Sequence, residues 1–464
     1  MTRKYLALAL SVCATLWLAG CSDDTTAPSQ LAAPAAPPMA AATAEVAALA
    51  AEVRTLAANQ GITPLTRPAP VRRELSLLGR ALAFDKILSG NKDISCMTCH
   101  LPKLATVDGR SVAIGTGGTG LGLQRTHPQG VFVHRNAPPL FNLSPMRVLT
   151  WDGRVFLNTT KNLVRTPTVQ LTAPQLAALE FGPVSALPMF PVLSRVEMRG
   201  TTGNELAAVP DSLPRRTWVF LMARLGAIPQ YRTMFQAAYP GQVFDSLNFA
   251  HAGNAIGGWI TDVFSFANSP WDLMLGGNDD AMTEQQLRGA KAFLTTAKCS
   301  LCHAGPLLTD QKFHNVAVPQ VGPGFGDGPT GHDDFGRMRE TKNLSDKYKF
   351  RTPPLRNVEL TAPYGHDGAI TTLRGWVDHY TASDVKLRNY DVNQLEPALR
   401  STLQPTASDI LLTRDSRLNK LPLTQQTIDD ITEFLKALTD PAARDMRSVV
   451  PTSVPSGLPV DNLP

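Results

Sequence analysis

The sequence predicts a mostly α-helical protein in which two similar modules follow one another, connected by long irregular loops. Its 464 residues include 37 prolines and 34 glycines. With few alternating runs of β-branched residues, this composition favours short helices joined by loops over extended sheets. A repeat indicates two modules, because an arginine, small residues and a phenylalanine precede a Cys-x-x-Cys-His motif in residues 78–110 and again in 287–310.

The N-terminus has the features of an export signal. Arg3 and Lys4 precede an apolar run that is too short to span a bilayer. The letters "LAGC", which end at Cys21, resemble a bacterial lipoprotein signal, and this resemblance implies cleavage before Cys21 and a lipid on its sulfur. An ordinary secretory signal is the alternative. The lipoprotein interpretation places the protein on the periplasmic side of a bacterial membrane, and Ser22 favours the outer membrane.

The chain divides into five segments. Residues 1–20 are the predicted signal peptide, and 21–60 are a flexible tether and linker, because small, Pro-rich stretches repay little of the entropy lost on ordering. The two modules occupy 61–280 and 281–440, and a Pro-rich, irregular tail follows in 441–464. The net charge of +5 is slight and evenly spread, which argues against a nucleic-acid partner.

Apolar residues at helical spacing predict a helix ahead of each motif and another near the end of each module. A capping box, Thr283 followed by Gln286, marks the start of one of these helices. The apolar residues are Leu75, Leu78 and Leu82, then Ile256, Ile260, Val263 and Phe264, then Leu287, Ala290 and Phe293, and finally Ile428, Ile431, Leu435 and Leu438. We expect almost all of them to be core residues that build a pocket around each motif.

The six cysteines limit the chemistry of the two motifs. Cys13 and Cys21 lie near the N-terminus, and the other four form "CMTCH" at 96–100 and "CSLCH" at 299–303. A zinc ribbon needs its two cysteine pairs about 15 to 20 residues apart, whereas these pairs are separated by about 200 residues. A thioredoxin-like redox pair needs a βαβ setting, which the pattern lacks.

Covalently bound haem c explains the spacing directly. Two thiols add across the vinyl groups of one porphyrin, and the adjoining histidine then lies beneath the iron as its fifth ligand. Two motifs therefore predict two haems and two cytochrome c-like domains in tandem. The predicted attachment cysteines are Cys96, Cys99, Cys299 and Cys302, and the predicted proximal iron ligands are His100 and His303.

Further motifs carry a resemblance to a known family. They are "TWDGR" (150–154), "VEM" (196–198), "FRTPPLRNVELTAPYGHDGAITTL" (350–373) and "FLKALTD" (434–440). Together with the haem motifs, they resemble the bacterial di-haem cytochrome c peroxidase and MauG family over roughly residues 70–440, with an insertion-like stretch at 157–193. The resemblance implies a peroxide site at the N-terminal haem and an electron-transfer role for the C-terminal haem.

The resemblance also implies roles for single residues. Trp151 matches the tryptophan between the haems, although packing is the commoner role of such a residue. Glu197 matches the acid-base glutamate beside the peroxide, although an isolated glutamate is more often a solvated surface group. Asn136, Thr361 and Pro363 match the positions that hold a calcium ion, which prefers oxygen ligands.

The sixth iron ligands decide between an electron carrier and a reactive haem. At the second haem, Tyr380 matches the family's distal ligand, and its neighbour His379 is the rival. A tyrosine there is typical of MauG-like members, whereas peroxidases usually have methionine. At the first haem, Thr116 stands at the place of a loop histidine and would leave the iron open, while His127 or His134 could close it.

Two functions from the family are expected. The first is a peroxidase that reduces hydrogen peroxide at the N-terminal haem with electrons relayed from a periplasmic donor protein. The alternative is a MauG-like oxidase that uses peroxide-derived oxidising equivalents to oxidise tyrosine or tryptophan side chains of a partner protein, and Tyr380 favours it. A plain electron-transfer cytochrome and a di-haem dioxygenase are the other classes, and Glu197 argues against the former.

Overall fold

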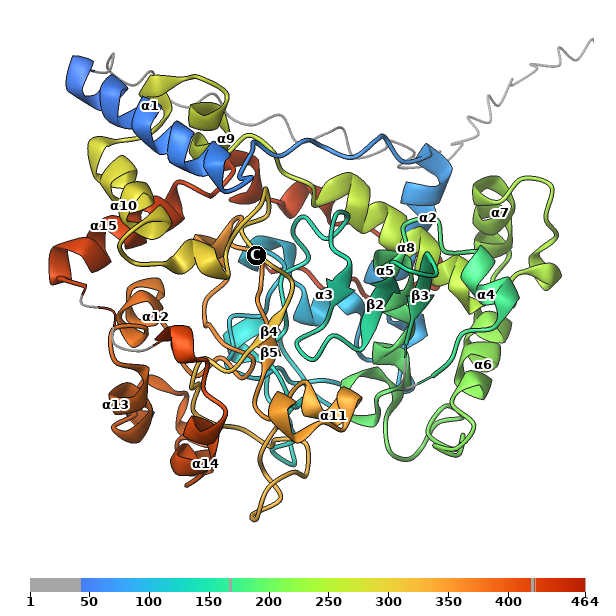
Figure 1. The fold of residues 1–464 in the computed structure, drawn as a ribbon. Coiled ribbons are helices and arrows are strands. Elements are labelled where there is room, and N and C mark those ends of the chain that lie inside the picture. Colours follow the sequence, from blue (N-terminus) through green and yellow to red (C-terminus); the bar gives the residue numbers. More distant parts are fainter. Residues whose placement is uncertain (1–42, 167–168, 419–420, 422, 464) are drawn as a thin grey trace, which may run out of the picture.

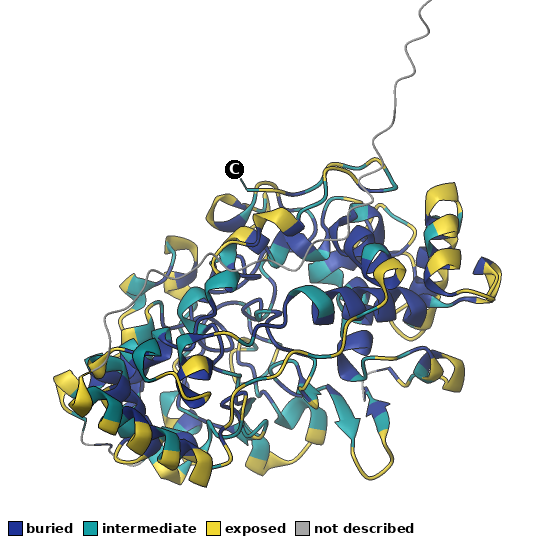
Figure 2. Ribbon diagram, turned by 90° about the horizontal axis from the view of Figure 1, so that it is seen from above, coloured by how far each residue is buried: buried dark blue, intermediate teal, exposed yellow. Residues whose placement is uncertain are grey.

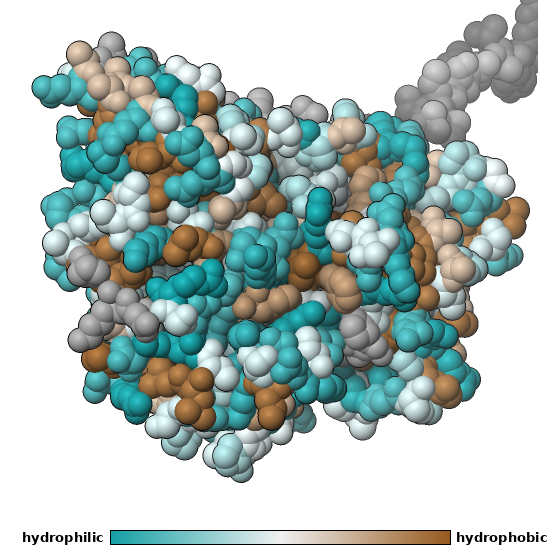
Figure 3. All heavy atoms as spheres, viewed as in Figure 1, coloured by the Kyte–Doolittle hydropathy of each residue, from teal (hydrophilic) through white to brown (hydrophobic). Residues whose placement is uncertain are grey.

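A computed structural model describes residues 43–166, 169–418, 421 and 423–463. The predicted signal peptide, Cys21 and the tether up to residue 42 lie outside the described residues. Within the described part, no helix combines the length and apolar character needed to cross a membrane. On the face in Figure 3, apolar side chains of the described residues are scattered among hydrophilic ones and form no single large patch.

The described residues are mostly helical, as the sequence predicts (Figure 1). The helices are α1 (Ala44–Asn59), α2 (Arg73–Phe84), α3 (Cys96–Cys99), α4 (Ala173–Ala177), α5 (Pro183–Ala186), α6 (Arg215–Gly226), α7 (Pro229–Ala238), α8 (Phe249–Val263), α9 (Pro270–Leu275), α10 (Glu284–Leu294), α11 (Met338–Thr341), α12 (Leu373–His379), α13 (Ser383–Arg388), α14 (Ala407–Leu412) and α15 (Gln425–Lys436). The strands are β1 (Val148–Leu149), β2 (Val155–Asn158), β3 (Leu163–Arg165), β4 (Phe313–His314) and β5 (Phe350–Arg351).

The strands form two small antiparallel sheets. In the first, β1 pairs with β2 and β2 pairs with β3, so that Phe156 lies opposite both Val148 and Arg165. In the second, β4 pairs with β5, with Phe313 opposite Arg351. Part of the insertion-like stretch at 157–193 thus extends the first sheet, and helix α5 within it packs on α8.

Helices α2 and α8 form the centre of the first hydrophobic core. The apolar residues predicted to face the core in both helices are buried, apart from partly buried Val263 at the end of α8. Gly79 lies where the two helices cross, because a Cβ there would be 1.9 Å from the carbonyl oxygen of Ala255. Any larger residue would force the helices apart.

Helices α10 and α15 form the second core in the same way. The predicted capping box is present, since Thr283 and Gln286 exchange hydrogen bonds of 3.0 and 3.2 Å at the start of α10. Gly289 lies at the crossing, where a Cβ would be 1.9 Å from the carbonyl oxygen of Asp430. Gly79 and Gly289 each lie where the helix before a Cys-x-x-Cys-His motif crosses its partner, so the repeat is visible in the helix packing.

The predicted flexible linker is wrong for its second half. Residues 44–59 form helix α1, which packs against α10 of the second module (Figure 1). Ala50, Val53 and Ala57 are fully buried there. Their spacing of three and four residues places them on one face of a helix, and burying that face offsets the entropy lost on ordering.

The module boundaries also differ from the predicted ones. Helix α9 lies before residue 281, yet its Trp271 and Met274 belong to the second core. The predicted tail from 441 is irregular except for two short 3₁₀ turns, but it packs on the first module. Its Met446 and Val449 are buried there. Figure 2 shows that the irregular segments between the helices contain buried as well as exposed residues. The chain therefore returns to its first module at the end.

Candidate functional site

The two predicted proximal histidines are held in the same way. His100 follows helix α3, and its Nδ1 lies 3.0 Å from the carbonyl oxygen of Thr106. His303 follows a 3₁₀ turn over Cys299–Leu301, and its Nδ1 lies 2.9 Å from the carbonyl oxygen of Leu308. A carbonyl oxygen only accepts, so Nδ1 carries the proton and Nε2 is left to bind a metal.

Burial keeps both of these imidazoles neutral. It lowers the pKa of His100 below its usual value and lowers the pKa of His303 to about 4. A neutral imidazole with a fixed Nδ1 proton is the form that coordinates iron. The two histidines therefore fit a proximal role.

The four described cysteines form no disulfide. Burial raises the pKa of Cys96 to about 11 and that of Cys299 to about 12. Active redox pairs need a thiol whose pKa is lowered towards neutrality, so these pairs do not fit thiol–disulfide exchange. Cys96, Cys99 and Cys299 pack against the hydrophobic cores, where a thioether to an apolar porphyrin would be accommodated.

A cavity of about 1350 Å³, counting the space at its mouth, lies beside the second motif. Cys299, Cys302 and His303 line it, and most of the remaining wall is apolar. Such a wall, with two thiols and one available imidazole nitrogen, fits a haem. The residues are therefore suited to the group that the motif predicts.

Of the neighbours Tyr380 and His379, only Tyr380 lines this cavity. Tyr380 lines it, and burial raises the pKa of its phenol. His379 is not among the lining residues, and its Nε2 donates a 2.8 Å hydrogen bond to the carbonyl oxygen of Val316. Of the two rivals, Tyr380 is the one that faces the space for the haem.

The predicted tryptophan and calcium positions lie on the same cavity. Trp151, Asn136, Thr361 and Pro363 all line it. The Trp151 Nε1 donates a 3.1 Å hydrogen bond to the carbonyl oxygen of Asn136. The Asn136 amide nitrogen donates to the carbonyl oxygen of Arg110 at 2.9 Å, which orients its Oδ1 away from that contact. Three oxygen-bearing positions on one wall fit a hard cation such as calcium.

Glu197 lies on a π-helical turn over Arg195–Arg199. Its backbone N–H donates to Ser194 Oγ at 3.3 Å, and its carbonyl oxygen accepts from the N–H of Thr116 at 2.8 Å. Among the described residues, its carboxylate has no hydrogen-bond partner. Burial raises the pKa of Glu197, while the positive charge of Arg154 opposes this shift. A partly buried, unpaired carboxylate is suited to proton transfer.

A buried ion-pair network joins the two modules, and the sequence analysis did not predict it. Arg135 Nη1 lies 2.6 Å from Asp152 Oδ2, and Arg135 Nε lies 2.6 Å from Asp334 Oδ2. Burial alone would raise the pKa of the Asp152 and Asp334 carboxyl groups. The positive charge of Arg135 outweighs this effect and holds the pKa of both groups below the usual range. Asp152 directly follows Trp151, so the network fixes the segment that carries this residue between the modules. The only sequence signal was the "TWDGR" motif.

Comparisons with known proteins agree with this geometry. A sequence profile described as "Di-haem cytochrome c peroxidase" matches residues 73–280. The cytochrome c551 peroxidase of Pseudomonas aeruginosa is 31% identical over 308 residues, which cover 66% of this chain and 72% of that protein. The chain belongs to the di-haem cytochrome c peroxidase family. The family is one of oxidoreductases and implies haem cofactors.

The chain is similar both to proteins named cytochrome c peroxidase and to proteins named MauG. The cytochrome c peroxidase Ccp of Escherichia coli K12 is 31% identical over 319 residues, which cover 69% of this chain but only 55% of that longer protein. MauG of Methylorubrum extorquens is 27% identical over 317 residues. A MauG-like protein associated with microbial copper homeostasis has a TM-score of 0.56 at 27% identity, and covers 85% of this chain and 96% of its own.

The three candidate residues at the distal side of the first haem, Thr116, His127 and His134, lie in different surroundings. Thr116 is buried next to Glu197, and its hydroxyl donates to Asp93 at 2.8 Å. His127 packs against the backbone of the neighbouring Gly117. His134 contacts the carbonyl oxygen of Gly324 through its Nδ1 and packs against Phe325 with a tilted ring, the ring centroids being 4.1 Å apart. Of the three residues, Thr116 is the one whose backbone is bonded to Glu197.

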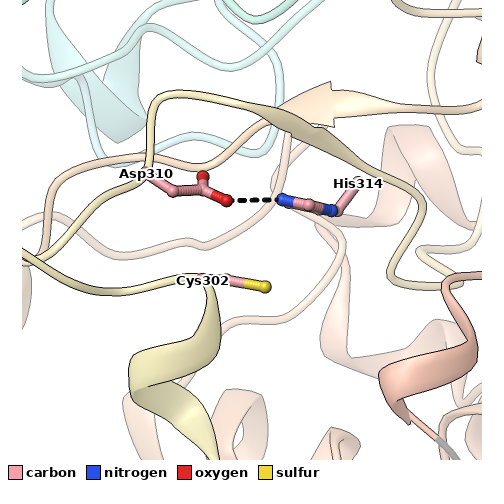
Figure 4. A group of neighbouring side chains, drawn as sticks. All are labelled: Cys302, Asp310 and His314. Carbon is pink, nitrogen blue, oxygen red and sulfur yellow. Dashed lines mark hydrogen bonds and ion pairs between the residues drawn. The ribbon is translucent and has the colours of Figure 1, made fainter.

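One further cluster lies beside the second haem motif (Figure 4). Cys302, Asp310 and His314 place a ligand atom each within 4.8 Å of one another, which resembles a metal site. Both ring nitrogens of His314 are occupied, however, by Asp310 at 2.9 Å and Asp415 at 2.8 Å. Since the sulfur of Cys302 belongs to a haem motif of the family, an ion pair explains the cluster better than a separate metal.

Proposed function

We propose that this protein is a di-haem peroxidase that reduces hydrogen peroxide at its first haem, with electrons relayed through the second haem from a periplasmic donor protein. The overall reaction consumes one peroxide, two electrons and two protons and forms two water molecules. The single observation that carries the proposal is the unpaired carboxylate of Glu197. It lies beside the loop that follows the first Cys-x-x-Cys-His motif.

Glu197 supplies the proton transfers that breaking the O–O bond requires. As a carboxylate it takes the proton from the oxygen of peroxide that becomes bound, and as an acid it returns this proton to the oxygen that leaves as water. Its raised pKa suits both steps, because a group whose pKa lies nearer the working pH exchanges protons more readily.

The chain's own residues also provide a connection between the two haem sites. Cys96, Cys99 and His100 would hold the first haem, and Cys299, Cys302 and His303 the second. When bound, the haems would supply the redox chemistry, by binding peroxide at iron and storing the oxidising equivalents. Trp151 lies on the wall of the second haem's cavity, and Arg135 fixes its segment, so we assign Trp151 to the electron path between the haems. Asn136, Thr361 and Pro363 would hold a calcium ion next to it.

Tyr380 favours a second candidate function. If Tyr380 bound the iron of the second haem, its phenolate would stabilise the oxidised iron, whereas the thioether of methionine would favour the reduced iron. A protein built in this way retains oxidising equivalents that can be passed to tyrosine or tryptophan side chains of a partner protein, as in a MauG-like oxidase. In both cases the export signal would direct the protein out of the cytoplasm, and a lipid on Cys21 would tether it to the periplasmic side of a bacterial membrane.

Low-temperature EPR of the diferric protein tests these functions. One sample is frozen as isolated, and a second is frozen after one equivalent of hydrogen peroxide without any reductant. One high-spin and one low-spin signal, both lost with peroxide, would support an open first haem and favour the MauG-like alternative. Two low-spin signals that peroxide leaves unchanged, but that respond after one-electron reduction, would support a peroxidase that a donor protein must first reduce.

A second measurement separates both enzymes from a plain electron carrier. If the fully reduced protein bound no carbon monoxide and also failed to consume peroxide, both irons would be closed and the proposed function would be wrong. Oxygen consumption in the absence of peroxide would instead support a dioxygenase.

A further inference from the structure

The two haem-attachment motifs differ in exposure at one of the two positions between their cysteines, since Met97 and Ser300 are both buried. Thr98 lies between Cys96 and Cys99 and is 0% exposed. The matching position in the second motif is Leu301, which is 54% exposed. Residues between the two cysteines of such a motif lie at the porphyrin edge that carries the thioether bonds. The edge of the first haem site is therefore covered, while that of the second is open.

The segment that covers Thr98 comes from the far end of the chain. We call residues 441–463 the C-terminal strap; it begins after the second module and runs back over the first. Three contacts attach it there, all within residues 80–98. The first is a 2.9 Å hydrogen bond from Arg80 Nε to the carbonyl oxygen of Val449.

The second contact is formed around Asp85, directly after helix α2. Ser456 donates its hydroxyl to Asp85 Oδ1 at 2.6 Å and its backbone N–H to Oδ2 at 3.2 Å. Tyr231 donates to the same carboxylate at 2.7 Å. Asp85 is fully buried, so Ser456 supplies hydrogen bonds that no water could easily replace.

The third contact is made with the haem motif itself. Thr98 Oγ accepts the N–H of Ser95 at 2.9 Å and donates its own proton to Asp461. Lys86 Nζ lies 2.6 Å from the other oxygen of Asp461 and balances its charge. Asp461 is only 8% exposed. A buried, paired carboxylate thus fastens the strap onto the turn that carries Cys96 and Cys99.

We propose that the C-terminal strap seals the attachment edge of the first haem, so that external one-electron reductants reach this protein through the second haem's edge at Leu301. The inference rests on the proposed function in that both motifs carry haem. It extends that function by assigning Asp461 as a positioning residue. Electron exchange with a reagent in solution weakens steeply with distance, so a sealed edge would direct electrons through the second haem and keep the first for peroxide.

The test is stopped-flow reduction of the holoprotein by reduced methyl viologen, in which each haem accepts one electron. In the wild-type protein, the second haem is expected to be reduced at a rate proportional to reductant concentration. The first haem should follow at a rate that becomes independent of that concentration, because its electron arrives from within the protein. A chain that ends at Pro455 lacks the contacts of Ser456 and Asp461, and its first haem should be reduced directly, in proportion to reductant.

Asp461→Asn tests the same contact with the strap in place. It should make reduction of the first haem depend on reductant concentration, because losing one hydrogen bond to a charged group shifts the strap about tenfold towards its open state. Asp445→Asn is the matched control, since Asp445 lies in the same strap but forms an exposed pair with Arg447. It should leave both rates unchanged. Haem content by pyridine haemochrome establishes that each variant holds two haems.

If the truncated chain yields no holoprotein, Asp461→Asn and Ser456→Ala decide the matter. A first haem whose reduction stays independent of reductant in every variant with two haems would overturn the seal. Direct reduction of the first haem in the wild-type protein would overturn it as well. Peroxide turnover measured on the same samples is a separate readout, so loss of the proposed peroxidase function would not be mistaken for loss of the seal.

Discussion

The backbone N–H of Thr116 donates a 2.8 Å hydrogen bond to the carbonyl oxygen of Glu197. This bond joins the loop after the first haem motif to the turn that carries the acid-base candidate. Asp93 receives the Thr116 hydroxyl at 2.8 Å and the N–H of Gly117 at 2.6 Å, which fixes the loop from its other side. Position and orientation of Glu197 thus depend on a loop some 80 residues away in the sequence.

Glu197→Gln should retain both haems yet slow peroxide cleavage by about 10²-fold or more, because the amide cannot accept and return a proton. Rapid mixing with peroxide measures the rate. Glu205→Gln is the control, since Glu205 is an exposed carboxylate paired with Arg224. An unchanged rate in Glu197→Gln would remove this residue from the mechanism.

The pH dependence of the same rate gives an independent test. The first proton transfer needs the carboxylate form, which is lost as the pH falls through the pKa of Glu197. Because burial raises this pKa, the decline should occur at higher pH than for an ordinary glutamate. The decline should be absent in Glu197→Gln, and its persistence there would assign it to another group.

Tyr380→Met should shift the midpoint potential of the second haem upwards, because a thioether favours the reduced iron more than a phenolate does. Spectroelectrochemical titration of the holoprotein measures the potential. His379→Gln is the control, since glutamine can still donate to the carbonyl oxygen of Val316. A shift in the control and none in Tyr380→Met would make His379 the ligand.

Arg135→Met should destabilise the protein by about 3–5 kcal/mol, because it leaves the buried carboxylates of Asp152 and Asp334 unpaired. Urea unfolding measures the free energy. In the control Arg232→Met, the exposed pair with Asp245 is lost, and the cost should stay below about 1 kcal/mol. Equal costs in both variants would contradict a structural role for the network.

The same network predicts how stability depends on pH. Arg135 lowers the pKa of Asp152 and Asp334 in the folded state, so the folded protein binds fewer protons there than the unfolded chain. Their contribution is present above the unfolded pKa of about 3.9 and is lost as the pH falls through the lower folded values. Urea unfolding at pH 6 and pH 3 should show this loss in the wild-type protein and a smaller loss in Arg135→Met.

Asn136→Ala should weaken calcium binding by roughly tenfold or more, because it removes the only side-chain amide oxygen among the three predicted ligand positions. Isothermal titration of the holoprotein after EGTA treatment measures the affinity. Asn389→Ala, which removes an exposed amide bonded to the carbonyl oxygen of Val385, should leave it unchanged. Absence of calcium binding in the wild-type protein would remove the site altogether.

Several features of this protein could be predicted from short stretches of its sequence. The Cys-x-x-Cys-His motifs were recognisable because covalent attachment and proximal ligation act on adjacent residues. The core faces of α2, α10 and α15 followed from helical spacing, and the capping box of α10 from two residues three apart. The roles of Glu197, Trp151 and Tyr380 were predicted from the family resemblance alone, because a single glutamate, tryptophan or tyrosine has no distinctive local pattern.

Local sequence was therefore enough to predict the family, the mostly helical fold and the two haem-attachment motifs. The tertiary structure decided which parts of the chain cover each module. Helix α1 packs on the second core, Arg135 bridges to Asp334, and Asp461 reaches Thr98 across more than 300 residues. Such contacts carry no periodicity, because their energy depends on burial and charge pairing that exist only once distant segments have packed together.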